Sequence, residues 1–173
     1  MVKIKNLSRD NPGISRAVAD FYCEALCVCL DRHHTSPETI HIENLGQIKL
    51  ASLKWPSSST FKAAHANEID ATEAGAYAIC IAAINKVRNL VAVARAETGT
   101  GADYYLAEPG TTAADLEDCI RLEVSGINRG NKAAVKGRLR VKVQQAVNGK
   151  SNLPAIASVV SFSALLVAIE DVP

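Results

Sequence analysis

The chain has 173 residues and a mass of 18.4 kDa, and its 19 basic and 18 acidic residues leave a net charge of +1 at pH 7. A hydrophobic fraction of 48% with 21% charged residues excludes a disordered, collagenous or coiled-coil chain and favours one folded domain with a sizeable core. Because no apolar run approaches the roughly 18–20 residues of a membrane span, and the first residues lack the apolar stretch of a secretory signal, no membrane partner is expected.

The first 68 residues are predicted to form an N-terminal α+β extension of this single domain. Apolar side chains at helical spacing indicate a helix, and a later stretch in which polar and apolar side chains alternate indicates strands. The predicted elements are a helix over residues 14–30, a hairpin or two short strands over 39–43 and 47–53, and a short helix over 60–66 after the linker-like residues 56–60.

Residues 69–173 are predicted to form an α/β core. A buried helix begins near Asp70, with Asp70 or Thr72 as its N-cap, and the segments that follow alternate between turns and apolar stretches of strand length. The predicted elements are a helix over 70–86, strands over 90–94, 102–107 and 119–125, a helix over 131–147, and a buried strand with a continuation, or else a helix, over 156–169. A helix between the third and fourth strands requires a crossover, which predicts a three-layer αβββαβ fold around a mixed sheet.

The near-zero net charge hides two neighbouring blocks of opposite sign. Seven acids lie from Glu97 to Glu123, and the next acid is Glu170. The stretch between Glu123 and Glu170 has seven bases and no acid. Adjacent blocks of this kind suit a site that holds a cation and faces an anion, although two solvated faces of opposite charge would give the same pattern.

Two acids of the first block fall within neighbouring predicted strands. Asp103 follows the turn at residues 99–101, and Glu123 lies inside an apolar strand, where a carboxylate costs free energy unless it is paired or holds a cation. Two such carboxylates on one face could bind Mg²⁺ or Mn²⁺, with the Val124 carbonyl as a further oxygen ligand. A salt bridge to Arg121 or Arg95, or simple exposure at a sheet edge, is the structural alternative.

The element order, with GADYYL on the second strand and RLEVSG on the third, resembles the core of the PD-(D/E)XK nuclease superfamily over residues 69–173. The resemblance implies metal-dependent hydrolysis of DNA phosphodiester bonds, with Asp103 and Glu123 as the metal-binding acids. It also makes Glu73, on the first core helix, the counterpart of an acid common in the superfamily. A first-turn glutamate that favours the helix dipole is the alternative for Glu73.

The sequence departs from the family pattern at one position. Ser125 stands where the third strand of the family carries a lysine, whose charge many members move to the following helix, often beside a glutamine. Here the helix over 131–147 offers Arg138, Lys142 and Gln145 on one side, at spacings of four and three. We therefore expect Lys142 to be the displaced lysine, with Lys136 as the second choice, and Gln145 to position groups beside it. The alternative is that Lys142 only extends to water.

The sequence thus predicts a Mg²⁺-dependent DNA endonuclease, and a homodimer for duplex cleavage. The catalytic residues would be Asp103, Glu123, Lys142, Gln145 and Glu73. The remaining bases of the helical region are expected to contact backbone phosphates. These bases are Arg129, Lys132, Lys136, Arg138 and Arg140.

A second hypothesis, supported by Ser125, is a non-catalytic nucleic-acid-binding or assembly subunit with a degenerate nuclease-like fold. Action on RNA stays open. Five cysteines, an odd number, argue against a disulfide scaffold and favour a cytoplasmic location. The four histidines form no ligand pattern and are expected in exposed loops.

Overall fold

A seven-stranded mixed sheet carries helices on both of its faces in the computed structural model, which describes residues 1–111 and 116–173. Asp115 of the acidic block lies outside the described residues. The elements in chain order are α1 (Leu7–Asp10), α2 (Arg16–Asp31), β1 (Glu38–Asn44), β2 (Gln47–Leu53), the 3-10 helix η1 (Lys62–His65), α3 (Glu68–Arg88), β3 (Val91–Arg95), β4 (Tyr104–Ala107), β5 (Ile120–Ile127), α4 (Lys132–Val147), β6 (Ala155–Ser161) and β7 (Leu166–Val172).

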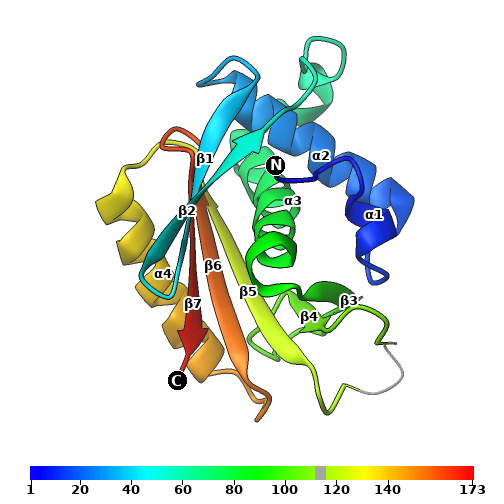
Figure 1. The fold of residues 1–173 in the computed structure, drawn as a ribbon, viewed down its shortest axis with the longest axis vertical. Helices are drawn as coiled ribbons and strands as arrows, with labels where there is room; N and C mark the ends of the chain where they lie inside the picture. Colours follow the sequence, from blue (N-terminus) through cyan, green and yellow to red (C-terminus); the bar gives the residue numbers. More distant parts are fainter. Residues whose placement is uncertain (112–115) are drawn as a thin grey trace.

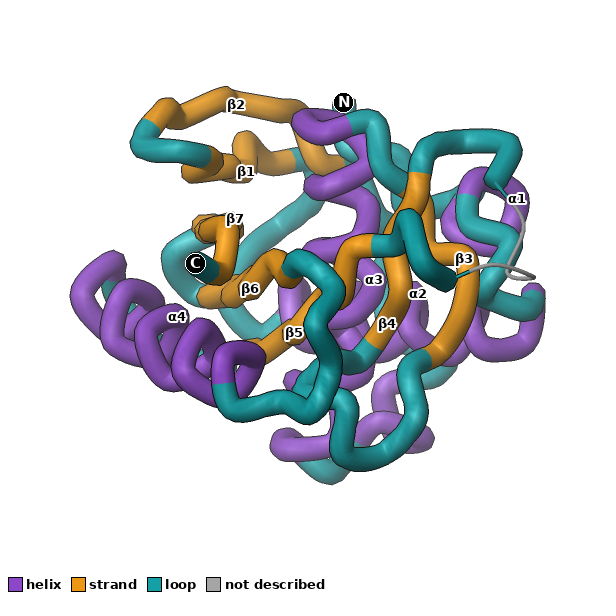
Figure 2. Tube along the Cα trace, turned by 90° about the horizontal axis from the view of Figure 1, so that it is seen from below, coloured by secondary structure: helices purple, strands orange, loops and turns teal. Residues whose placement is uncertain are grey.

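The layers are α4, the sheet, and the pair α2–α3, as Figure 1 shows with α4 on the left of the sheet and α3 on its right. Figure 2 gives the same order from below for the middle of the sheet, with β5 and β6 between α4 and α3. The predicted three-layer α/β fold is therefore confirmed. None of the helices among the described residues has the length and hydropathy of a membrane span.

Helix α3 is buried on almost every side because α2 packs against the face that the sheet leaves free. Its small side chains permit this packing: a Cβ on Gly75 would lie only 3.0 Å from the Leu26 backbone of α2. The helix begins at Glu68, two residues earlier than Asp70. Asn67 is the N-cap, and its side chain accepts hydrogen bonds from the backbone N–H groups of Ile69 and Asp70, so the predicted caps are wrong.

The core strands have the predicted order and one added hairpin. Strands β3, β4 and β5 are successively antiparallel, and α4 forms the crossover that makes β6 parallel to β5. The predicted buried strand of the apolar segment over residues 156–169 is β6, and its continuation is a second, antiparallel strand, β7, after a turn in which Leu165 has a φ of 46°. The alternative of a helix is wrong.

The N-terminal hairpin belongs to the same sheet. Its turn has positive φ at Leu45 (51°) and Gly46 (75°), as a two-residue hairpin turn of the primed type requires. Strand β1 pairs with β2 and, in parallel, with β7, where His41 lies opposite Leu166. The sheet order is β2-β1-β7-β6-β5-β4-β3, and one apolar core joins the extension to the remainder of the chain.

The cysteines behave as predicted and the histidines do not. All five cysteines are free thiols, and four of them are buried. His65 is only 5% exposed, and His33 and His34 are half-buried and hydrogen-bonded to residues from the C-terminal half of the chain. His41 is exposed but lies in β1, so none of the four is an exposed loop histidine.

Candidate functional site

The candidate site lies where the short strand β4 begins and the longer strand β5 continues without it. The first residue pair of the two strands is Tyr104 with Leu122, so Asp103 stands just outside the ladder. The Val124 backbone N–H donates to Asp103 Oδ2 at 2.8 Å, which places this carboxylate against the free edge of β5. A difference in strand length thus brings Asp103 beside Glu123, and these two residues form the acid pair of the site.

Asp103 is held from a second side by α3. The Tyr77 hydroxyl donates to Asp103 Oδ1 at 2.7 Å, and the Arg95 guanidinium donates to the Tyr77 oxygen at 3.2 Å. Arg95 itself is 3.7 Å from Asp103 Oδ1 and lies over the rings of Tyr77 and Tyr104, with its central carbon 4.6 and 4.8 Å from their centroids. Burial raises the pKa of Tyr77 well above its ordinary value, and the charge of Asp103 adds to this effect, so the hydroxyl is a neutral donor.

Glu123 comes from β5 and meets a lysine from α4. Lys142 Nζ lies 2.8 Å from Glu123 Oε1, and the two side chains are only 18% and 12% exposed. Burial raises the pKa of the Glu123 carboxyl, and Asp103 adds to the effect, whereas the hydrogen bond and charge of Lys142 act in the opposite direction. The expected displaced lysine therefore reaches the acid pair.

Arg121 holds the flanking segments in place. Its buried guanidinium donates to the Ala146 carbonyl in the last turn of α4 (2.9 Å), to Thr100 in the turn before Asp103 (3.0 Å) and to Leu153 (3.0 Å). Arg121 does not form a salt bridge with either acid, whereas the other expected alternative, a salt bridge from Arg95, is present at Asp103. The turn and the helix approach so closely that a Cβ on Gly101 would lie 2.8 Å from the Gly149 Cα.

The acid pair separates two hollows in the surface. One hollow, of about 460 Å³, is lined by Asp103, Glu123, Lys142 and Gln145 together with Arg95 and the turn over residues 96–102. The other, of about 570 Å³, extends along the free edge of β5, and Asp103 and Lys142 line it as well. The remaining groups of this second hollow include Glu73, Val124, Ser125, Asn128, Arg129 and Arg138.

The structure brings most of the predicted site residues to this place. The acid pair, Asp103 and Glu123, has three other predicted residues around it: Lys142, Val124 and Gln145. Arg129 and Arg138 line the adjoining hollow. Glu73 is exposed at the same hollow, 3.3 Å from the Tyr77 hydroxyl, whose single proton is engaged more closely with Asp103.

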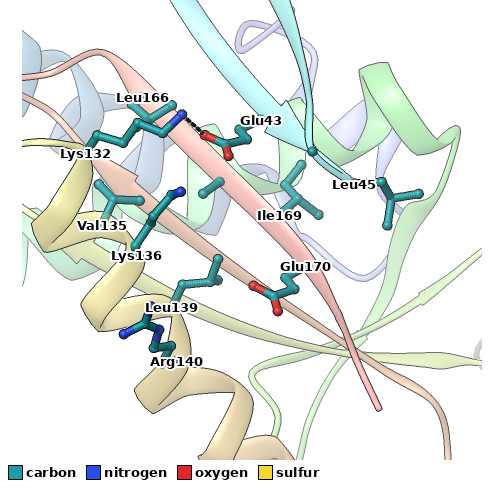
Figure 3. Close-up of a pocket in the computed structure, with 12 residues that line it drawn as sticks. Glu43, Leu45, Lys132, Val135, Lys136, Leu139, Arg140, Leu166, Ile169 and Glu170 are labelled. Carbon is teal, nitrogen blue, oxygen red and sulfur yellow. Dashed lines mark ion pairs between the residues drawn. The ribbon is translucent and has the colours of Figure 1, made fainter.

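Three of the expected phosphate contacts lie elsewhere. Lys132, Lys136 and Arg140 line a separate cavity of about 460 Å³ between α4 and the strands β1 and β7. Figure 3 shows them projecting from α4, with Lys132 paired to Glu43 at 2.8 Å and Glu170 on the facing strand. Because α4 turns these bases away from Lys142, they do not share the hollows beside the acid pair.

Sequence reasoning missed Tyr77 and Asn128. Each acts through residues distant in the chain: Tyr77 through Asp103, and Asn128 through His33, whose Nε2 lies 2.9 Å from Asn128 Oδ1. The four-residue spacing of Glu73 and Tyr77 puts them on one side of α3, which is the only signal that could have indicated Tyr77.

The carboxylate oxygens of Asp103 and Glu123 suit a hard cation that binds the protein and a substrate at the same time. Within the described residues there is no group of three or more His, Cys, Asp or Glu side chains able to hold a metal ion by themselves. Two neighbouring carboxylates fit Mg²⁺, which commonly binds through one or two carboxylates and completes its shell with water and substrate phosphate. Each oxygen of Asp103 accepts one described hydrogen bond and so retains a lone pair.

Comparisons with known proteins add nothing to this geometry: no family model matches the chain, and neither a curated protein nor a solved structure is significantly similar to it.

Proposed function

We propose that the protein is a Mg²⁺- or Mn²⁺-dependent nuclease that hydrolyses DNA phosphodiester bonds. The observation that carries the proposal is the hydrogen bond between Lys142 and Glu123 beside Asp103, because three successive parts of the chain, the turn before β4, strand β5 and helix α4, contribute an acid, a second acid and a cation to one place. This grouping is the one that the resemblance to the PD-(D/E)XK superfamily implies when the motif lysine is moved to the following helix.

The acids have different tasks from the lysine. Asp103 and Glu123 supply carboxylate oxygens, and the Val124 carbonyl a further oxygen, for a metal ion that polarises the phosphate and lowers the pKa of a bound water. Lys142 Nζ stabilises the negative charge that develops on the phosphate, since its amine is already held at the acid pair. Gln145, one turn along α4, orients the phosphate or the attacking water, and Glu73 assists through a water.

Hollows on both sides of the acid pair support cleavage within a chain. A strand laid across the site continues in both directions, so a free end is not required. One such site cuts one strand, and a homodimer would supply the second cut in a duplex.

The decisive experiment is a cleavage assay on a DNA duplex and on single-stranded DNA and RNA, with Mg²⁺, Mn²⁺ or neither. We expect Asp103→Ala and Glu123→Ala each to lower the metal-dependent rate by more than the roughly 10–100-fold loss typical when only a hydrogen-bond partner of a metal ligand is removed. Glu170→Ala, an exposed acid at the other cavity, is the matched control and should cut at the original rate. Unchanged cleavage by both site variants would rule out the assignment.

Lys142→Ala separates catalysis from binding. It should lower turnover far more than DNA affinity, because its charge acts on the transition state. An equal loss of both would reduce Lys142 to a phosphate contact. The alternative function, a binding or assembly subunit with a degenerate site, is favoured by Ser125 alone; it predicts salt-sensitive DNA binding with no cleavage under any divalent metal.

A further inference from the structure

Asn128 forms a buried polar wall of the 570 Å³ hollow beside the acid pair. The residue is 9% exposed and directly follows β5. Its Oδ1 lies 2.9 Å from His33 Nε2, and an amide oxygen can only accept, so the histidine carries its proton on Nε2 and donates. The amide nitrogen Nδ2, with two hydrogens to donate, has no acceptor within the described residues.

His33 therefore determines which way the Asn128 amide faces. The histidine lies in the segment after α2, 95 positions away from Asn128 in the chain. The pairing is therefore a tertiary contact and not a local turn. A buried donor without an acceptor is costly, and native proteins retain such groups where a ligand or water satisfies them. Asn128 thus contributes an unused donor, enclosed in the protein, at the wall of the hollow that the residue lines.

Charged residues of both signs line this hollow: Glu68, Glu73 and Asp103 are acidic, and Arg129, Arg138 and Lys142 are basic. Arg129, the residue after Asn128, and Arg138, one turn before Lys142 on α4, are both exposed. Neither arginine takes part in an ion pair within the described part of the chain, unlike Lys132 at the other cavity. Two free guanidinium groups and an amide donor suit an anion with several acceptor oxygens, as a phosphodiester has.

We propose that Asn128, Arg129 and Arg138 form a subsite for the backbone phosphate next to the one at the acid pair, with His33 as the positioning residue for Asn128. The inference rests on the proposed function for the ligand being a nucleic-acid strand. Nδ2 is shielded from solvent in the unliganded molecule. Binding therefore includes a small displacement of side chains at the rim, a change common on ligand binding.

The test is the affinity for a fluorescent oligonucleotide, measured by anisotropy with Ca²⁺ in place of Mg²⁺, and beside it the affinity for a mononucleotide. Asn128→Asp retains the acceptor for His33 and replaces the unused donor by a negative charge. We expect it to weaken oligonucleotide binding by about tenfold or more, since hydrogen bonds to charged groups are among the stronger ones. Asn152→Asp, an exposed position with the same chemical change, is the matched control and should bind as the original protein does.

His33 is tested by rescue. His33→Leu removes the donor that orients Asn128 and should weaken binding several-fold, whereas His33→Gln supplies an amide N–H and should restore most of the affinity. Melting temperatures of all variants separate this effect from unfolding: a loss of affinity at an unchanged melting temperature supports the positioning role, and equal affinities for both His33 variants contradict it.

The outcomes distinguish this subsite from the nuclease proposal. Cleavage by the original protein, with Asn128→Asp binding as tightly as Asn152→Asp, would overturn the subsite and leave the nuclease. Weaker binding by Asn128→Asp in a protein that cuts nothing would support the subsite and overturn the nuclease. An effect on the mononucleotide but none on the oligonucleotide would overturn a backbone-phosphate subsite, and no binding of DNA at low salt would overturn both proposals.

Discussion

The hydrogen bond between Lys142 and Glu123 couples two groups with opposite preferences. Burial favours the neutral form of Glu123, and Lys142 favours its charged form. The net result is a raised pKa, so at a given pH a larger fraction of Glu123 is protonated than for an ordinary glutamate. A protonated carboxyl is a poor ligand for Mg²⁺, and metal-dependent activity should therefore depend on this residue losing its proton.

We predict that the rate of metal-dependent cleavage falls, as pH decreases, at a higher pH than an ordinary glutamate would give. Lys142→Ala should move this acid limb to still higher pH, because it removes the interactions that lower the pKa of Glu123 while leaving the burial and the charge of Asp103. The measurement is the pH–rate profile of both proteins at saturating Mg²⁺. An acid limb that Lys142→Ala leaves in place would show that the two groups are not coupled.

Tyr77 acts on Asp103 through a single hydrogen bond of 2.7 Å. Tyr77→Phe removes only the hydroxyl and leaves the ring that packs under Arg95. We predict that the Mg²⁺ concentration for half-maximal activity rises by roughly tenfold, the lower end of the range for such partners of metal ligands. Tyr105→Phe is the control, because Tyr105 lies on the face of β4 opposite to Tyr104 and packs in a different apolar cluster from Tyr77. Identical Mg²⁺ curves for the two variants would mean that Tyr77 serves packing alone.

At the scale of the elements, the contact between α3 and β5 sets the position of Tyr77 relative to Glu123. A Cβ on Gly126 would lie 2.5 Å from the Thr72 carbonyl oxygen, so the two elements meet backbone to backbone at the rim of the hollow. Any larger residue must push α3 away from β5, which moves the partner of Asp103 as well.

We predict that Gly126→Ala destabilises the fold by about 1–3 kcal/mol, as overpacking of a close contact does. Gly137→Ala is the matched control: it lies in the interior of α4 with open space around the added Cβ, so it should stabilise by about 0.5–1 kcal/mol. Denaturant unfolding of both variants measures these free energies. Equal stabilities would contradict the close packing of α3 on β5.

The same elements indicate what a sequence can and cannot predict. The order from the first core helix to β6 follows from periodicity and turn residues, which are local properties, and so does the closeness of Asp103 to Glu123, although β4 begins one residue after Asp103 and not at the predicted residue 102. The parallel pairing of β1 with β7 and the contacts of Tyr77 and His33 join residues far apart, and periodicity carries no record of them. The N-cap at Asn67 was missed because several polar residues precede the helix and only backbone geometry selects one.

For the whole molecule, α4 divides the basic block between two surfaces. Arg129, just before the helix, and Arg138 line the hollow beside the acid pair, whereas Lys136 and its neighbours face β7 and an acid from β1 (Figure 3). The block is continuous in sequence, but a helix distributes it around its circumference. A DNA strand that crosses the acid pair therefore meets only part of the block.

We predict that Arg138→Gln lowers the slope of log affinity against log salt for duplex DNA by about 0.9, the value for one phosphate contact. Lys136→Gln removes the same charge from the other side of α4 and should leave the slope as it was. Titrations at several salt concentrations give both slopes. A similar decrease in both would mean that DNA covers the cavity of Figure 3 as well.

The parallel pairing of β1 with β7 affects how the chain folds during its synthesis. The hairpin formed by β1 and β2 cannot join the sheet until β7, near the other end of the chain, has been made. Until then β1 exposes an unpaired edge, a state that invites wrong pairing between chains. Folds that depend on such long-range strand contacts are slow to form, commonly in milliseconds to seconds. Expression at low temperature should accordingly increase the yield of folded protein, because it lowers the concentration of incompletely folded chains whose β1 edges could pair with one another.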